Sequence, residues 1–143
     1  MARYVATIPS TMTAEAAFAY MSDLRNFVEW DRGIKKVEQV EGNGAGLDTV
    51  FDITVRGKGG KDSVLRYKTL EFDVPSNLLV KGRNNMFTSV DRITVTPTAT
   101  GCDVVYDAVL TANGIYWPMN FVLNRVFKKV GDAAVAGLRK KLA

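Results

Sequence analysis

Histidine is absent from the 143-residue sequence. Histidine is the usual zinc ligand and the usual general base in proteins. Its absence removes the usual zinc ligand and excludes every Ser-His or Cys-His nucleophile arrangement. Any catalysis would have to use carboxylates, tyrosine, other hydroxyls, basic side chains or the single cysteine, Cys102. We therefore expect neither a metal ion nor a cofactor.

One cysteine cannot form an internal disulfide, and it gives no support for secretion into an oxidising compartment. The first residues lack the apolar core of a secretory leader, and no stretch approaches the roughly 18 apolar residues of a membrane span. These observations predict a cytoplasmic protein.

Positive charge is in slight excess, since 19 lysines and arginines stand against 15 acids and give a net charge of +4. The basic residues gather in the segment 56–61 and late in the chain at 128–141, without the interleaved aromatic residues typical of nucleic-acid binders. Segment 56–61 also lacks the spacing of a phosphate-binding loop. We expect no nucleic-acid partner.

Hydrophobic periodicity predicts one strand, two short helices, six strands and a long helix. The first strand spans 3–8, and the short helices span 14–21 and 24–30, where Thr13 and Asp23 are suited to cap them. Turn residues separate the six following strands, and apolar residues recur every three or four positions along the last helix. The six strands are expected at 34–41, 47–56, 63–74, 78–82, 86–97 and 102–112, and the long helix at 116–142.

Short connections between consecutive strands indicate an antiparallel meander, because parallel strands need long crossovers. One face of such a sheet must be buried against the amphipathic last helix. We therefore expect a single domain over residues 1–143 of the α+β class. Its curved antiparallel sheet of about seven strands should wrap around a long C-terminal helix, with a small apolar molecule held between them.

Five local motifs add to this pattern: FVEWDRG at 27–33, YKTLEFDVP at 67–75, SVDRITVTP at 89–97, GCDVVY at 101–106 and VGDAAVAGL at 130–138. With these motifs in this order, the whole chain resembles the START and Bet v 1-like (SRPBCC) superfamily, in particular the bacterial polyketide cyclase/dehydrase and lipid-transport family. The resemblance implies a helix-grip fold whose cavity members use for lipids, sterols, polyketides or other apolar compounds. Some members are cyclases, others carry ubiquinone-like molecules, and others act as toxin components.

Two carboxylates are candidate catalytic residues. Asp91 alternates in phase with Ile93 and Val95, so it should face inward, where it serves either as a ligand anchor or base, or as a structural partner of a neighbouring side chain. Glu71 shares parity with Tyr67 and would then also face the cavity, unless a bulge reverses it. If both were inside and close together, they would form a coupled acid–base pair.

The remaining candidates are apolar or polar residues expected along the cavity. Trp30 and Phe27 are interpreted as a core plug beneath the short helices. The segment 113–123 has four interpretations: a gate, a membrane-touching lip, a dimer contact, or ordinary packing against the short helices. The expected ligand-binding residues are Tyr67, Ser89, Asp91, Tyr106, Phe51, Phe87, Trp117, Phe121, Asn124 and Phe127.

Three functions are compatible with these features. The first is a carrier or sensor of a small hydrophobic ligand, acting as a monomer or homodimer with or without transient membrane contact. The second is a metal-free cyclase or dehydratase that uses Asp, Glu or Tyr. The third is a regulatory or toxin-like interaction protein that uses the basic segment 56–61 and the last helix.

Overall fold

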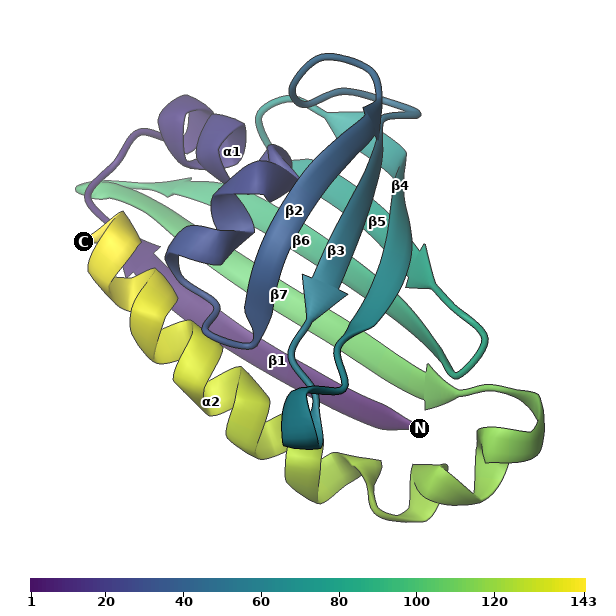
Figure 1. Cartoon of the computed structure of the whole chain (residues 1–143). Helices are drawn as coiled ribbons and strands as arrows, with labels where there is room; N and C mark the ends of the chain where they lie inside the picture. The colour runs from purple at the N-terminus through teal and green to yellow at the C-terminus, as the bar shows by residue number, and fades with distance from the viewer.

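The computed structural model describes residues 1–143 apart from the side chain of Lys58, so the contribution of that lysine to the basic segment lies outside the described residues. Strands and helices follow one another as the hydrophobic pattern predicts (Figure 1). The elements are β1 (Ala2–Ser10), α1 (Ala14–Ser22), η1 (Leu24–Glu29), β2 (Ile34–Glu41), β3 (Val50–Val55), η2 (Lys58–Gly60), β4 (Ser63–Asp73), β5 (Asn77–Arg83), β6 (Phe87–Thr98), β7 (Gly101–Ala112), η3 (Gly114–Phe121) and α2 (Leu123–Leu142).

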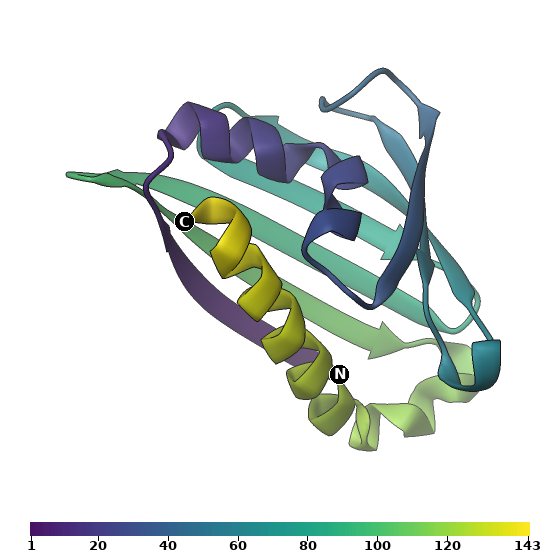
Figure 2. The ribbon, with the colours of Figure 1, turned by 60° about the vertical axis from the view of Figure 1, so that its left-hand side comes forward.

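All seven strands form one antiparallel sheet in the order β1-β7-β6-β5-β4-β3-β2. The last six are a meander, and β1 joins it by pairing with β7. Figures 1 and 2 show the sheet curving around α2, which runs beside β1, while α1 and η1 cover the other part of the concave face. The expected helix-grip fold is confirmed.

Both short helices begin at the side-chain caps that the sequence predicts. The hydroxyl of Thr13 accepts a hydrogen bond from the Ala16 amide at 3.1 Å, and the carboxylate of Asp23 accepts one from the Arg25 amide at 3.1 Å. Such caps satisfy amides that lack partners in the first turn of a helix. Phe18 and Met21 are buried, so α1 closes one end of the core.

The expected helix at 116–142 is wrong in its first part. Residues Gly114–Phe121 form the 3-10 helix η3, and the α-helix begins only at Leu123. Asn120 explains the break, because its side-chain oxygen accepts a hydrogen bond from the Ala112 amide at 2.9 Å and its nitrogen donates to the Ala112 carbonyl at 3.3 Å. These bonds hold η3 against the end of β7 and redirect the chain into α2.

Close approach of α2 to the rest of the core depends on a glycine. A Cβ atom on Gly137 would lie 2.2 Å from the backbone oxygen of Trp30, so only glycine allows this contact. The C-terminal end of α2 is further fixed by Ser10, whose hydroxyl donates to the Leu142 carbonyl, and by the buried side chain of Leu138. Among the described residues, no helix is long and apolar enough to cross a bilayer.

Candidate ligand-binding cavity

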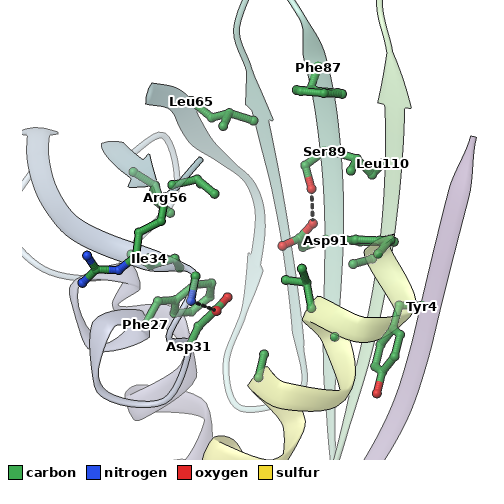
Figure 3. A pocket seen from close by; sticks show the side chains of 18 of the residues that line it. Tyr4, Phe27, Asp31, Ile34, Arg56, Leu65, Phe87, Ser89, Asp91 and Leu110 are labelled. Atoms are coloured by element: carbon green, nitrogen blue, oxygen red, sulfur yellow. Dashed lines mark hydrogen bonds between the residues drawn. The ribbon is translucent and has the colours of Figure 1, made fainter. Parts of the chain in front are cut away.

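A cavity of about 370 Å³ lies between α2 and the concave face of the sheet. Its volume falls within the range of small-molecule sites in proteins. Side chains from β1, β2, β3, β4, β6, β7, α2, η1 and the segment between η1 and β2 form its walls, and most of them are apolar (Figure 3). The large apolar side chains of the lining include Phe27, Trp30, Ile34, Ile53, Leu65, Phe87, Leu110, Leu123, Phe127, Val135 and Leu138.

A buried carboxyl group interrupts this apolar lining. Asp91 on β6 is only 5% exposed, and it accepts a hydrogen bond from the Ser89 hydroxyl at 2.8 Å and one from the Tyr106 hydroxyl at 2.6 Å. Strand alternation puts residues 89 and 91 on the same face, and β7 pairs beside β6 so that Tyr106 reaches the same carboxyl. The two donors occupy different oxygens of Asp91, which the structure therefore fixes in position.

Burial in this lining raises the pKa of Asp91 to about 6, from an ordinary value of 3.8. The hydrogen bonds from Tyr106 and Ser89 favour the ionised form and limit the rise, whereas the nearby negative charge of Asp31 adds to it. Burial and the charge of Asp91 also raise the pKa of Tyr106 well above its ordinary value. Tyr106 therefore acts as a neutral donor toward Asp91.

Tyr67 extends this polar group across a neighbouring strand. Its ring crosses Gly82 on β5, where a Cβ atom would lie 2.4 Å from the ring, and Gly82 is paired with Ser89 on β6. The absence of a side chain at Gly82 thus allows a tyrosine of β4 to approach the polar group of β6. The pKa of Tyr67 is raised by burial and by the charge of Asp91.

Asp31 is a cavity residue that the sequence analysis missed. It follows η1, lines the cavity, and accepts a hydrogen bond from the Gly33 amide at 2.8 Å. Burial raises the pKa of its carboxyl. Because Asp31 lies in a turn, no strand or helix periodicity indicates its direction; the Asp-Arg-Gly turn at 31–33 was the only local signal.

Trp30 is both a core residue and a cavity residue. It is 5% exposed, and its ring lies edge-on to Tyr106 with the ring centres 5.9 Å apart. Its indole Nε1 is buried without a hydrogen-bond partner among the described residues. Buried polar groups normally have partners, so this unpaired donor is an exception in the core.

Six of the sequence-predicted binding residues share this cavity, and four do not. Phe51 is wholly buried but lies outside the lining, because strand parity gives the face of a residue and not its position along the strand. Asn124, Trp117 and Phe121 are exposed, because the chain turns between η3 and α2 and carries these side chains away from the cavity. The residues that line the cavity as expected are Tyr67, Phe87, Ser89, Asp91, Tyr106 and Phe127.

The expected inward position of Glu71 is also wrong. The pairing of β4 with β5 shifts register between Thr69 and Glu71, and this bulge turns Glu71 to the outer face of the sheet. There it accepts hydrogen bonds from Arg92 at 3.2 Å and from Asn77 at 2.9 Å, and its side chain is 43% exposed. Asp91 and Glu71 therefore do not form an acid–base pair.

The segment that forms η3 does not pack as an ordinary core element. None of its residues is buried, and it contacts mainly β7 and α2 instead of the two short helices. Trp117 and Phe121 contact each other, with ring centres 5.3 Å apart, while Ile115 is 87% exposed. The interpretation of this segment as packing against the short helices is wrong.

The family model described as polyketide cyclase / dehydrase and lipid transport matches residues 1–143. The chain belongs to this family. No curated protein matches the sequence. Membership of the polyketide cyclase/dehydrase and lipid-transport family supports a role in binding a hydrophobic ligand.

Solved structures share the fold of this family member at low sequence identity. A START superfamily protein from Mycobacterium smegmatis is 13% identical, with 98% of this chain and 96% of that chain covered and a TM-score of 0.77. The protein TTHA0849 from Thermus thermophilus is 14% identical, with 99% of this chain and 95% of that chain covered and a TM-score of 0.76. The di-domain ARO/CYC StfQ from the steffimycin biosynthetic pathway is 12% identical with a TM-score of 0.73; 98% of this chain is covered, but the chain spans only about half of StfQ.

The raised pKa of Asp91 in this family member predicts a pH-dependent loss of stability. A group whose pKa is raised on folding contributes stability at low pH that is lost as the pH rises through the folded-state pKa. Relative to Asp91→Asn, the free energy of unfolding of the wild type should fall by about 2 kcal/mol between about pH 4 and about pH 7, as measured by urea denaturation.

Asp52 provides a control of opposite sign. It lies on the outer face of β3, where a hydrogen bond from Arg66 lowers its pKa, so its contribution to stability is lost as the pH falls. The wild type should therefore gain stability relative to Asp52→Asn as the pH rises. If the free energy of unfolding of the wild type changed with pH in the same way as that of Asp91→Asn between about pH 4 and about pH 7, the burial of an ionisable Asp91 would be contradicted.

Proposed function

We propose that this protein binds a small apolar ligand in the cavity between the sheet and α2, as a carrier or sensor. The cavity itself carries the proposal, because protein interiors are close-packed and rarely leave large voids. Here a cavity of about 370 Å³ is lined mostly by apolar side chains. Small residues help to keep this space open, since Ala108 and Ala134 are part of the wall.

The small number of polar groups in an apolar site fixes the orientation of a ligand, whereas the apolar lining supplies most of the affinity. In this cavity the orienting role falls to the carboxyl of Asp91 with its two hydroxyl donors. Burial of the ligand's apolar part would supply most of the binding free energy, at about 25 cal/mol per Å².

A second candidate, a cyclase or dehydratase, is favoured by one observation. A carboxyl with a pKa of about 6, hydrogen-bonded to Tyr106 inside an apolar cavity, has the properties of a general base near neutral pH. Recovery of the bound compound distinguishes the two functions. A carrier releases the compound that it took up unchanged, whereas an enzyme converts it, and Asp91→Asn would then stop the conversion.

The proposal predicts that an apolar compound co-purifies with the protein and is detected by native mass spectrometry and by organic extraction. Ala108→Phe should reduce its amount at least about tenfold, because Ala108 is buried in the cavity wall and a phenyl ring there would fill the space.

Val105→Phe is the matched control, since it places the same ring on the outer face of β7 and should leave the bound compound in place. Equal recovery from wild type and Ala108→Phe would count against the cavity as the binding site.

We further propose that the ligand is loaded at an anionic lipid surface through η3. Ile115, Trp117 and Phe121 are exposed on η3, and the exposed cations Arg125 and Lys129 follow at once on α2. Apolar and aromatic side chains beside basic ones are the usual composition of surfaces that bind anionic bilayers. The first turns of α2 also supply Leu123, Val126 and Phe127 to the cavity wall, so this surface adjoins the cavity.

Sedimentation with phosphatidylglycerol vesicles tests this loading surface. The wild type should bind these vesicles more tightly than phosphatidylcholine vesicles. Phe121→Asp should reduce binding several-fold, because a carboxylate is costly to bury in the bilayer and is repelled by the anionic lipids. Val64→Asp, at a half-exposed valine of β4, is the control. The proposal would be overturned in favour of a dimer contact if the protein did not bind the vesicles and instead formed a dimer that Phe121→Asp disrupts.

A further inference from the structure

Two carboxyl groups from different parts of the chain face the same apolar cavity. Asp91 comes from the middle of β6, and Asp31 comes from the turn between η1 and β2 on the opposite wall. Figure 3 shows both carboxyls turned toward the space between these walls. A cavity built mainly of hydrocarbon thus holds two groups of the same charge sign.

Among the side chains that the structure describes, no basic group neutralises either carboxyl. Neither Asp31 nor Asp91 belongs to any of the described ion pairs. Arg56 is the one described basic residue of the lining, and its Nε donates to the Arg32 carbonyl at 3.2 Å. In Figure 3 its guanidinium points away from Asp91.

The hydrogen bonds of the two carboxyls leave acceptor capacity unused. Each oxygen of Asp91 accepts one hydroxyl, and one oxygen of Asp31 accepts the Gly33 amide. The other oxygen of Asp31 has no partner in the described hydrogen bonds, although an ionised carboxylate can accept about four in total. The described donors therefore do not fill this capacity, and among the described residues no positive charge lies against the two carboxyls.

Electrostatics decides which head group suits such a site. An unpaired carboxylate in an apolar environment is costly, and a second negative charge nearby increases the cost. A cation placed between the two carboxyls would offset both and would form charge-assisted hydrogen bonds. A ligand carboxylate in the same place would add a third negative charge and be rejected.

We infer that the cavity prefers an apolar ligand ending in a protonated amine over the same ligand ending in a carboxylate. This inference rests on the proposed function, because it concerns the head group of a ligand held in the same cavity. A hydroxyl head group, which donates one hydrogen bond without carrying charge, should be intermediate.

Decylamine, decanol and decanoate provide a matched set of probes, since they share one chain and differ in the head group. Isothermal titration calorimetry near neutral pH, below the micelle concentration of each compound, should give affinities in the order amine, alcohol, carboxylate. The ratio between amine and carboxylate should be at least about tenfold, since close like charges disfavour binding by more than the 1.4 kcal/mol that tenfold represents.

Variants connect this ratio to the two carboxyls. Asp31→Asn combined with Asp91→Asn should bring the ratio close to one, whereas Asp52→Asn removes a charge from the outer face and should leave the ratio unchanged. Circular dichroism checks the fold of each variant. If the double variant does not fold, Asp31→Asn alone serves, because Asp31 lies in a turn and is less buried than Asp91; it should lower the ratio several-fold.

Three results would overturn the inference. Decanoate that binds as tightly as decylamine, or a ratio that survives the aspartate substitutions, would contradict the head-group preference and leave the proposed function standing. Absence of binding by all three compounds would contradict the proposed function as well.

Discussion

A carboxyl group surrounded by hydrocarbon is costly unless donors surround it, and Asp91 imposes this requirement on the centre of the molecule. Residues of four strands surround this carboxyl. Ser89 on β6 and Tyr106 on β7 donate to the two oxygens, and Gly82 on β5 leaves room for the ring of Tyr67 on β4. The register of the sheet and the chemistry of the cavity are therefore coupled, since a slip of one residue would turn Asp91 to solvent.

The same region also explains why the core is not filled. Curvature of the sheet separates its concave face from α2, and the wall of the cavity between them includes the small residues Ala108 and Ala134. At the other end of α2, Gly137 brings the helix into contact with the backbone of Trp30 and closes the core. The helix is thus anchored at its C-terminal end, whereas its first turn adjoins the exposed η3, and its residues from Leu123 to Leu138 border the cavity.

Strand alternation allowed much of the site to be predicted, because it depends only on local geometry. It correctly turned Ser89, Asp91 and Tyr106 to the inside. It failed at Glu71, where a bulge that has no signature in the residue pattern reverses the face. Strand alternation also does not indicate where along a strand a residue lies relative to the cavity. For this reason Phe51 was wrongly expected in the cavity wall.

The other errors involve contacts between distant residues. The amide of Asn120 bonds to the backbone of Ala112 and so ends the expected helix early, and no helix propensity carries this information. Asp31 reaches the cavity because η1 folds over the sheet, which a sequence pattern in a turn cannot indicate. Resemblance to a family predicted the fold, whereas the head-group chemistry had to come from the position of these side chains.

The central claim is that an ionisable carboxyl lies inside an apolar cavity, and the titration of Asp91 tests it most directly. Carbon-13 NMR of the labelled carboxyl, assigned by comparison with Asp91→Asn, should give a pKa of about 6. A value at or below the ordinary 3.8 would mean that Asp91 is solvated or paired with a cation, and it would contradict the account.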